Sequence, residues 1–307
     1  MFFRLRRSLQ VRRYNKEVRA ILDAPPLRLD PTSQYTLVSQ ICHFDVLMWL
    51  VAAKSWARYA PPRRVWLLDD GSLTPADIGL LNKHVAGLTV VTRGDVENPR
   101  CPKGFFFERI LLIADLVADS YVMQLDSDTV TTSEPTEAVT CIHGGTCFTL
   151  GTDFVPEVVP ILEAQQICAD RDWTARQLQH EQVQSELAFD KLSNPETRRY
   201  VRANAAFAGF ARGAISRDDV ESFSEEMEAL LGERWTAWGT EQVTSNYLIA
   251  NQLEAKIFHE PRYAWHAPGH DLTAACFVHF IGTHRFENGT YGRLSRQVAE
   301  ELIDAGE

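Results

Sequence analysis

Residues 121–129 read YVMQLDSDT, an apolar run that ends in two aspartates separated by one serine. The run 121–125 predicts a buried strand that stops where the polar residues begin. Because side chains alternate along an extended chain, Asp126 and Asp128 are expected to point to one side, where both can reach one divalent cation. Such a cation would offset their mutual repulsion and could hold a diphosphate. An acidic turn after a strand is the other interpretation of the same pattern.

Strands and helices alternate on either side of this stretch. Strands are predicted at 35–41, 65–68 and 88–91, and helices at 45–59, 75–84 and 106–117. The helix at 75–84 has a clear start, with Thr74 as N-cap, Pro75 in the first turn and Asp77 three residues after the cap. This alternation indicates an α/β fold with a mostly parallel, Rossmann-like sheet flanked by helices.

The rest of the chain is less regular. Helices are predicted at 158–169, 173–192, 220–231 (with Gly232 as its stop) and 240–253, and strands at 204–210 and 276–281. We therefore expect a basic arm and proline-rich linker at 1–34, one large domain at 35–295 and a helical tail at 296–307.

Composition excludes several classes of protein. Of the 307 residues, 45% are hydrophobic and 23% are charged, which argues against disorder, collagen and coiled coil. The net charge is −10, but residues 1–20 carry +6, which leaves −16 for the remainder. An acidic body argues against nucleic acid as a partner. No apolar run is long enough to span a bilayer.

The arm and the cysteines bear on location. Residues 1–20 can form a basic amphipathic helix that lies on anionic lipid, or a helix that packs on its own protein. The six cysteines contain no CxxC pair, which favours a reducing compartment. We expect a cytoplasmic protein, with peripheral contact at the inner face of a membrane if the arm binds lipid.

Two further stretches place polar groups at strand ends. LLDDGS at 67–72 offers Asp69 and Asp70 for a nucleobase or ribose, or for a turn that leads a helix. VHFIGTHR at 278–285 places His279 on an apolar strand, as a third metal ligand or as a satisfied core histidine. Arg285 nearby can bind phosphate oxygens.

Together, Asp126-x-Asp128 and His279-x-x-Gly282-x-x-Arg285 resemble the GT-A fold glycosyltransferases, most of all the retaining glycosyltransferase family 8. The resemblance implies Mn²⁺ (or Mg²⁺) as cofactor and a nucleotide-sugar donor, usually a UDP-sugar. It also implies transfer of a hexose with retention to a carbohydrate or lipid-linked acceptor.

Further positions match that family in order along the chain. The resemblance implies that Arg109 contacts the nucleotide sugar, that Asn204-Ala205 touches the donor sugar, and that Glu241-Gln242-x-x-x-Asn246 lies beside the reacting carbon, with Gln242 and Glu241 as catalytic groups. Independently, Gln242 and Asn246 are spaced to share one helix face. The family's Ala-Asp-Asp after the first strand is absent from 39–42, and the chain has Glu241, Arg285 and Ala206 where aspartate, lysine and glycine are usual.

Two other functions remain open on the sequence. Asp126-x-Asp128 also fits the first motif of haloacid-dehalogenase-like phosphatases, for which Asp218-Asp219 is the later acidic pair. A non-catalytic nucleotide-sugar-binding or membrane-scaffold protein could keep the same motifs. For a carbohydrate acceptor, the candidate stacking surfaces are Trp235, Trp238, Tyr263 and Trp265.

Overall fold

The computed structural model describes residues 2–104, 106–282 and 284–306, and the side chains of residues 2–8 lie outside that description. The chain divides into two compact units. The first consists of Met1–Thr92, Leu125–Val139 and His259–Glu307, and the second of Arg93–Gln124 and Thr140–Phe258. The fold is mixed α/β, with seven strands in a main, mostly parallel sheet flanked by helices, as the sequence predicts.

In the first unit, three parallel strands end at a common edge. They are β1 (Tyr35–Ile41), β2 (Arg64–Asp69) and β3 (Thr89–Thr92), in the order β1-β2-β3. Ile41 pairs with Asp69, and Asp69 pairs with Thr92. The helices α2 (Val46–Ala57) and α3 (Pro75–His84) connect these strands, with η2 (His43–Asp45) before α2. The predicted cap of α3 is present: the Thr74 side chain accepts from the Asp77 amide, and Asp77 accepts from the Thr74 amide.

A small second sheet in the same unit carries the residues that follow the two aspartates. Its strands are β5 (Thr129–Thr131), β11 (Tyr263–Trp265) and β12 (Phe277–His279), in the order β11-β12-β5. The strand β12 runs antiparallel to β5, and His279 pairs with Thr129. This register brings a C-terminal histidine beside the end of the loop at 126–128.

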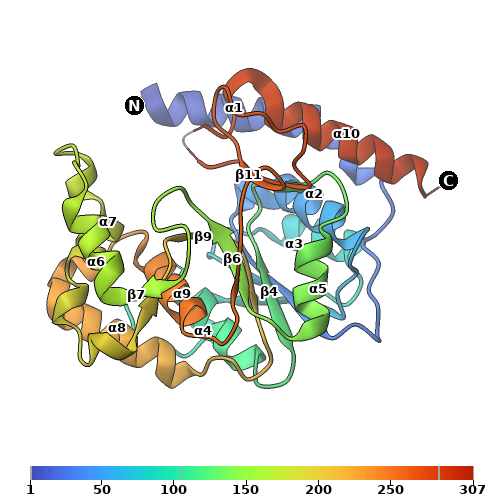
Figure 1. Cartoon of the computed structure of the whole chain (residues 1–307). Coiled ribbons are helices and arrows are strands. Elements are labelled where there is room, and N and C mark those ends of the chain that lie inside the picture. Colours follow the sequence, from blue (N-terminus) through green and yellow to red (C-terminus); the bar gives the residue numbers. More distant parts are fainter. Residues whose placement is uncertain (1, 105, 283, 307) are drawn as a thin grey trace. The chain divides into compact units, whose positions relative to one another are not determined.

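The N-terminal helix α1 (Phe2–Glu17) packs against the C-terminal helix α10 (Thr290–Asp304), and the two lie side by side in Figure 1. Val11, Tyr14 and Val18 are buried, so one face of residues 9–20 of the predicted arm packs on its own protein, while Leu9, Arg12 and Arg13 are exposed. The lipid-facing prediction for residues 1–20 also concerns side chains 1–8, which lie outside the described residues. Helix α10 begins at Thr290, six residues before the predicted tail at 296–307. No helix among the described residues is long and apolar enough to cross a bilayer.

The second unit combines four strands of the main sheet with most of the remaining helices. Its strand order is β10-β6-β9-β4. These strands are β4 (Tyr121–Leu125), β6 (Phe148–Gly151), β9 (Ala203–Phe210) and β10 (Lys256–Phe258); β7 (Val159–Pro160) and β8 (Arg199–Tyr200) form a separate pair. The helices are α4 (Phe107–Leu116), α6 (Ile161–Asp170), α7 (Glu181–Leu187), α8 (Arg217–Leu231) and α9 (Thr240–Ala250), and the residues of α5 (Thr136–Gly144) are divided between the first unit and the second after Val139.

The predicted helix at 173–192 is wrong. The chain there forms three short helices, η4 (Gln177–Gln179), α7 and η5 (Phe189–Lys191). Trp173 instead packs edge-on against Phe154, with the Arg171 guanidinium 4.7 Å from its ring, and the His180 side chain caps a fresh helix start at α7. These contacts of Trp173 and His180 divide the segment.

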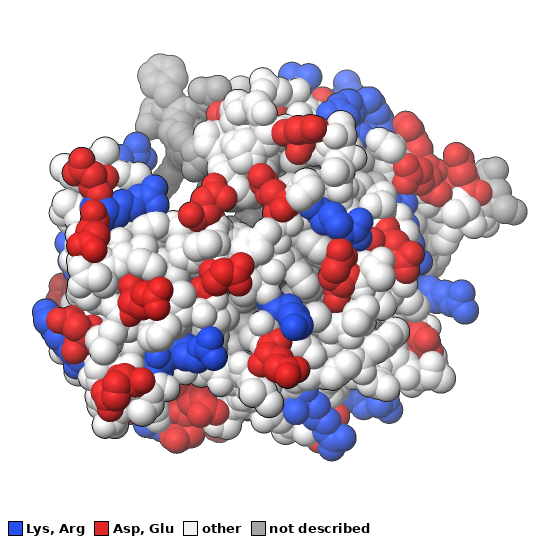
Figure 2. Space-filling model, viewed as in Figure 1, with Lys and Arg blue, Asp and Glu red and all other residues white. Residues whose placement is uncertain are grey.

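Charged side chains are dispersed over the visible surface. Figure 2 shows acidic groups scattered across one face with arginines and lysines between them, and no continuous basic surface on that face. The acidic excess of the body is therefore spread out on this face rather than gathered in one patch.

Candidate functional site

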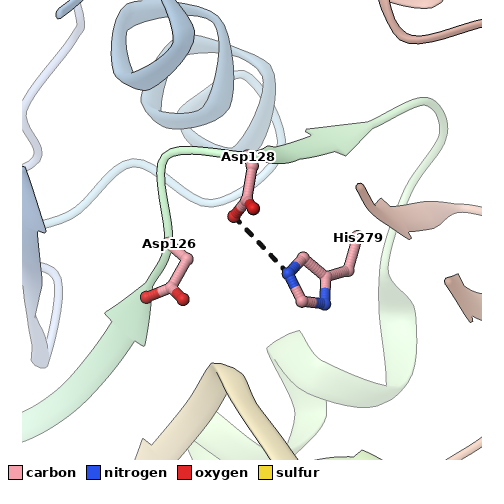
Figure 3. A group of neighbouring side chains, drawn as sticks. All are labelled: Asp126, Asp128 and His279. Atoms are coloured by element: carbon pink, nitrogen blue, oxygen red, sulfur yellow. Dashed lines mark ion pairs between the residues drawn. The ribbon is translucent and has the colours of Figure 1, made fainter. Parts of the chain in front are cut away.

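Asp126, Asp128 and His279 converge in the first unit (Figure 3). One ligand atom of each lies within 4.8 Å of the others. Asp128 and His279 are 5% and 6% exposed, and Asp126 is half-buried. The two aspartates lie on the loop between β4 and β5, and the pairing of β12 with β5 supplies the histidine. The structure thus assembles two carboxylates and an imidazole from distant parts of the chain.

Asp128 is held by two basic groups. Its Oδ1 lies 3.5 Å from His279 Nε2, and Arg285 Nη2 donates to its Oδ2. Burial alone would raise the pKa of Asp128, but the charges of Arg285 and His279 outweigh it and hold this pKa well below the usual range. Asp128 is therefore a carboxylate at neutral pH. Arg285, predicted to bind phosphate, lies in this structure on a metal-ligand candidate.

The backbone of the aspartate loop is fixed at three consecutive carbonyls. The Asp126 carbonyl accepts from Thr129 Oγ1 at 2.9 Å, the Ser127 carbonyl from Tyr291 Oη at 3.2 Å, and the Asp128 carbonyl from the Phe280 amide at 2.8 Å. With each peptide held, the directions in which the two aspartate side chains leave the backbone are set before any ligand arrives.

A third carboxylate belongs to this neighbourhood and was missed in the sequence. Asp45 ends η2, just after β1, and its Oδ2 accepts from Cys42 Sγ at 3.2 Å. Burial raises the pKa of Asp45, Arg285 lowers it, and Asp128 raises it further. The only signal available in the sequence was an acidic residue four positions beyond the strand end at Ile41.

The site residues predicted elsewhere in the first unit include Asp69, Asp70 and Gly282. Asp69 Oδ1 accepts three amides, from Gly71 to Leu73, and Asp70 Oδ1 accepts from the Ser72 amide and hydroxyl. These bonds build the turn before α3, which is the structural interpretation of the acidic pair. At Gly282, an added Cβ would meet no atom within 4 Å, so the backbone there borders open space.

In the second unit, Arg109 on α4 and Glu241 on α9 form a buried ion pair. Arg109 Nη2 lies 3.0 Å from Glu241 Oε1, and both side chains are 3–4% exposed. The guanidinium also stacks 4.6 Å from the Phe106 ring centre. Asn246, one turn further along α9, is fully buried and donates to the Ala203 carbonyl at 3.0 Å, which ties α9 to β9.

Gln242 faces β9 and helix α7. Its Oε1 accepts from the Ala205 amide at 3.5 Å, and its Nε2 donates to Gln182 Oε1 at 3.3 Å. Asn204 turns its Oδ1 to the Ala206 amide at 3.0 Å. The structure therefore brings Gln242 together with Ala205 and adds Gln182, which no motif in the sequence indicated.

The four aromatic residues predicted as stacking surfaces for an acceptor differ in how exposed their rings are. Trp235 and Tyr263 are buried in the core, so neither presents a ring face to solvent. Trp265 is half-buried with its ring edge-on to His270 at 4.3 Å. Trp238 is 62% exposed. Only Trp238 of this set offers most of its ring for stacking.

Asp218 and Asp219, the acidic pair that a phosphatase would need, lie in the first turn of helix α8. Asp219 accepts from the Ser216 amide and hydroxyl in the capping box of α8. Asp218 pairs with Arg100 at 2.9 Å. Neither aspartate follows a strand end, where the phosphatase motif would require it.

Comparison with known proteins gives a likeness of fold. No family model matches the chain, and no curated protein matches it in sequence. The galactosyltransferase LgtC, solved with donor and acceptor sugar analogues, is 11% identical with a TM-score of 0.48, over 87% of this chain and 96% of that chain. An active-site mutant of LgtC is 12% identical with a TM-score of 0.46, over 87% and 95% of the chains. Mouse xyloside xylosyltransferase 1 is 8% identical with a TM-score of 0.44, over 81% and 98%. These similar structures are glycosyltransferases, and at such low identities and TM-scores the likeness assigns no activity to this chain.

Proposed function

We propose that this protein is a metal-dependent glycosyltransferase that moves a hexose, with retention, from a UDP-sugar to a carbohydrate or lipid-linked acceptor. The observation that carries the proposal is the convergence of Asp126, Asp128 and His279 within 4.8 Å. The order of motifs along the chain supports the same reaction, because the remaining polar groups resemble those that bind a nucleotide sugar.

The donor set fits a divalent cation such as Mn²⁺ or Mg²⁺. Carboxylate oxygens and one imidazole nitrogen are ligands that Mn²⁺ accepts. Metal–ligand bonds of about 2.1–2.3 Å place two ligand atoms up to about 4.5 Å apart, so a small movement of the three side chains would close the site. A bound cation supplies Lewis-acid stabilisation of a departing diphosphate.

Arg285 has a second role once Asp128 is neutralised. In the present geometry the guanidinium pairs with Asp128. When that carboxylate has another positive partner, Arg285 can turn its donors to a phosphate oxygen of the donor. We assign Gly282 to the close approach of that phosphate, because open space borders its backbone. We assign Asp69 and Asp70, at the end of β2, to the nucleoside.

The second unit supplies the groups proposed for the sugar. Glu241 and Gln242, with Asn204 and Ala205, would bind the donor hexose, and Gln242 is the group we place nearest the anomeric carbon. Its carbonyl oxygen would stabilise the positive charge that develops there as the glycosidic bond breaks. Arg109 would contact the nucleotide sugar while paired with Glu241, and Asn246 keeps α9 on β9.

For the acceptor, Trp238 is the available stacking surface. For location, all six cysteines are free thiols in the described structure, which supports a reducing compartment such as the cytoplasm. The exposed Arg12 and Arg13 of α1 support contact of residues 1–20 with an anionic membrane surface. Co-sedimentation with anionic vesicles should fall when residues 1–20 are removed, and an unchanged bound fraction would refute the lipid contact.

The function is tested by thermal shift against a panel of nucleotide sugars, with and without Mn²⁺, followed by release of UDP. A UDP-sugar with Mn²⁺ at a hundredfold excess over Kd should stabilise the fold by about 2.7 kcal/mol. UDP should then be released only when the metal is present. Para-nitrophenyl phosphate is the control substrate: its hydrolysis without UDP release would favour a phosphatase. Binding of UDP and Mn²⁺ without turnover would instead favour a scaffold protein.

A further inference from the structure

The N-terminal and C-terminal helices meet at one buried aromatic pair. Tyr14 of α1 and Tyr291 of α10 stack with ring centres 4.3 Å apart and planes 27° apart. The Tyr14 hydroxyl is hydrogen-bonded to Ser295 Oγ at 2.9 Å. Tyr14 is 2% exposed and Tyr291 is fully buried. The arm is therefore fastened by a specific contact 281 positions apart in sequence.

Tyr291 continues from this pair into the aspartate loop. Its hydroxyl donates to the Ser127 carbonyl at 3.2 Å, and its ring also stacks on Phe280, with centres 4.3 Å apart. The Phe280 amide in turn donates to the Asp128 carbonyl at 2.8 Å. The Tyr291 side chain thus contacts the loop through its own hydroxyl and packs on the residue that holds the next carbonyl.

The hydrogen bond from Tyr291 to the Ser127 carbonyl affects both aspartates because of where Ser127 lies. Ser127 is the single residue between the two carboxylates, and each peptide group is planar. Fixing its carbonyl fixes the peptide plane that joins it to Asp128, and so limits how far the two carboxylates can rotate apart. Burial raises the pKa of Tyr291 well above its usual value, so the hydroxyl remains a donor at neutral pH.

We infer that Tyr291 is a positioning residue for the metal loop, and that Tyr14 of the N-terminal helix keeps Tyr291 in place. The inference rests on the proposed metal site. Under this inference the N-terminal arm helps to support the metal site. Tyr14 stacks on Tyr291, which donates to the Ser127 carbonyl and stacks on Phe280, and the Phe280 amide donates to the Asp128 carbonyl. Partners that orient metal ligands commonly change metal affinity by about 10-fold to 100-fold when removed.

The test compares two single hydroxyl deletions on the full-length protein. Tyr291→Phe keeps the stack and loses the hydrogen bond to Ser127. Ser295→Ala keeps both rings and loses the hydrogen bond to the Tyr14 hydroxyl, so it is the matched control for the loss of one buried hydroxyl. Mn²⁺ affinity is measured by titration calorimetry, and the electron paramagnetic resonance spectrum of bound Mn²⁺ reports the geometry of its ligands.

We expect Tyr291→Phe to raise the Kd for Mn²⁺ about 10-fold and to broaden the spectrum, while Ser295→Ala leaves both unchanged. A third variant, Tyr14→Ala, removes the supporting ring and should raise the Kd in the same direction. Equal Kd values in wild type, Tyr291→Phe and Tyr14→Ala, all folded by circular dichroism, would overturn the inference while the metal site stands. Failure of wild type to bind Mn²⁺ would instead overturn the proposed function on which it rests.

Discussion

Replacing Asp128 with asparagine changes one charge at the centre of the proposed metal site. Asp128→Asn keeps the shape of the side chain and its place on the loop. It removes the carboxylate that faces both His279 and Arg285. Two effects follow: one on the stability of the protein alone, and one on its response to Mn²⁺.

The first effect is the loss of a partner for a buried cation. Removing one member of a buried ion pair costs about 3–5 kcal/mol. The Arg285 side chain is 14% exposed, and Asp45 also acts on its charge. The cost should therefore lie at the lower end, about 3 kcal/mol. The second effect is the loss of about 2.7 kcal/mol that Mn²⁺ at a hundredfold excess over Kd adds to the wild type.

Urea unfolding with and without Mn²⁺ separates the two effects. The wild type and Asp128→Asn should differ by about 3 kcal/mol without metal and by about 6 kcal/mol with it. Asp30→Asn is the control, since Asp30 is a surface carboxylate that accepts local bonds from Thr32 and Ser33 and the change should leave the Mn²⁺ response intact. If Asp128→Asn gains as much stability from Mn²⁺ as the wild type, Asp128 is not a ligand and the reasoning is wrong.

Other parts of the structure give further predictions. Glu241→Gln should reduce turnover about 10² to 10³-fold with little change in Mn²⁺ affinity, because it removes a preorganised charge at the proposed sugar site; steady-state UDP release checks this, and an unaltered kcat would contradict it. Trp238→Ala should raise the acceptor KM about fivefold, as a lost stacking contact of about 1 kcal/mol implies, while donor hydrolysis is unchanged; an equal rise in the donor KM would count against an acceptor surface. Burial and the Lys54 charge lower the pKa of His84 to about 4, so the unfolded chain binds a proton more readily and stability should fall as pH decreases from 6.5 toward 4. Burial lowers the pKa of Lys54 to about 8, which likewise makes stability fall as pH decreases from 10.5 toward 8. Urea unfolding measured at a series of pH values should show both decreases in the free energy of unfolding. His84→Gln, which does not titrate, should lose the decrease between pH 6.5 and 4. If that decrease is unchanged in the variant, His84 is not its source.

The sequence predicted those features that local chemistry determines. Helix α3 begins where Thr74, Pro75 and the capping carboxylate indicate, because all of its start signals lie within four residues. The loop at 126–128 was also predicted from local signals, because its two aspartates directly follow the apolar run 121–125. The helix at 173–192 was not, since its breaks depend on the contact of Trp173 with Phe154 from elsewhere in the chain.

The candidate site was predicted in the same uneven way. The histidine partner of the two aspartates was found through the spacing of a known motif. Asp45, Tyr14 and Tyr291 were not found, because the sequence around each looks like that of an ordinary helix or strand end. Their relation to the loop comes from packing between segments far apart in the chain, which periodicity and capping rules do not describe.

The distance in sequence between Asp128 and Arg285, 157 positions, has a consequence for biosynthesis. A nascent chain leaving the ribosome displays both aspartates long before the histidine and the guanidinium are translated. During that interval the acidic loop has no native cation to neutralise it, and the first helix has no C-terminal partner on which to dock. A message that ends before codon 279 would thus yield a chain with both carboxylates but without the imidazole.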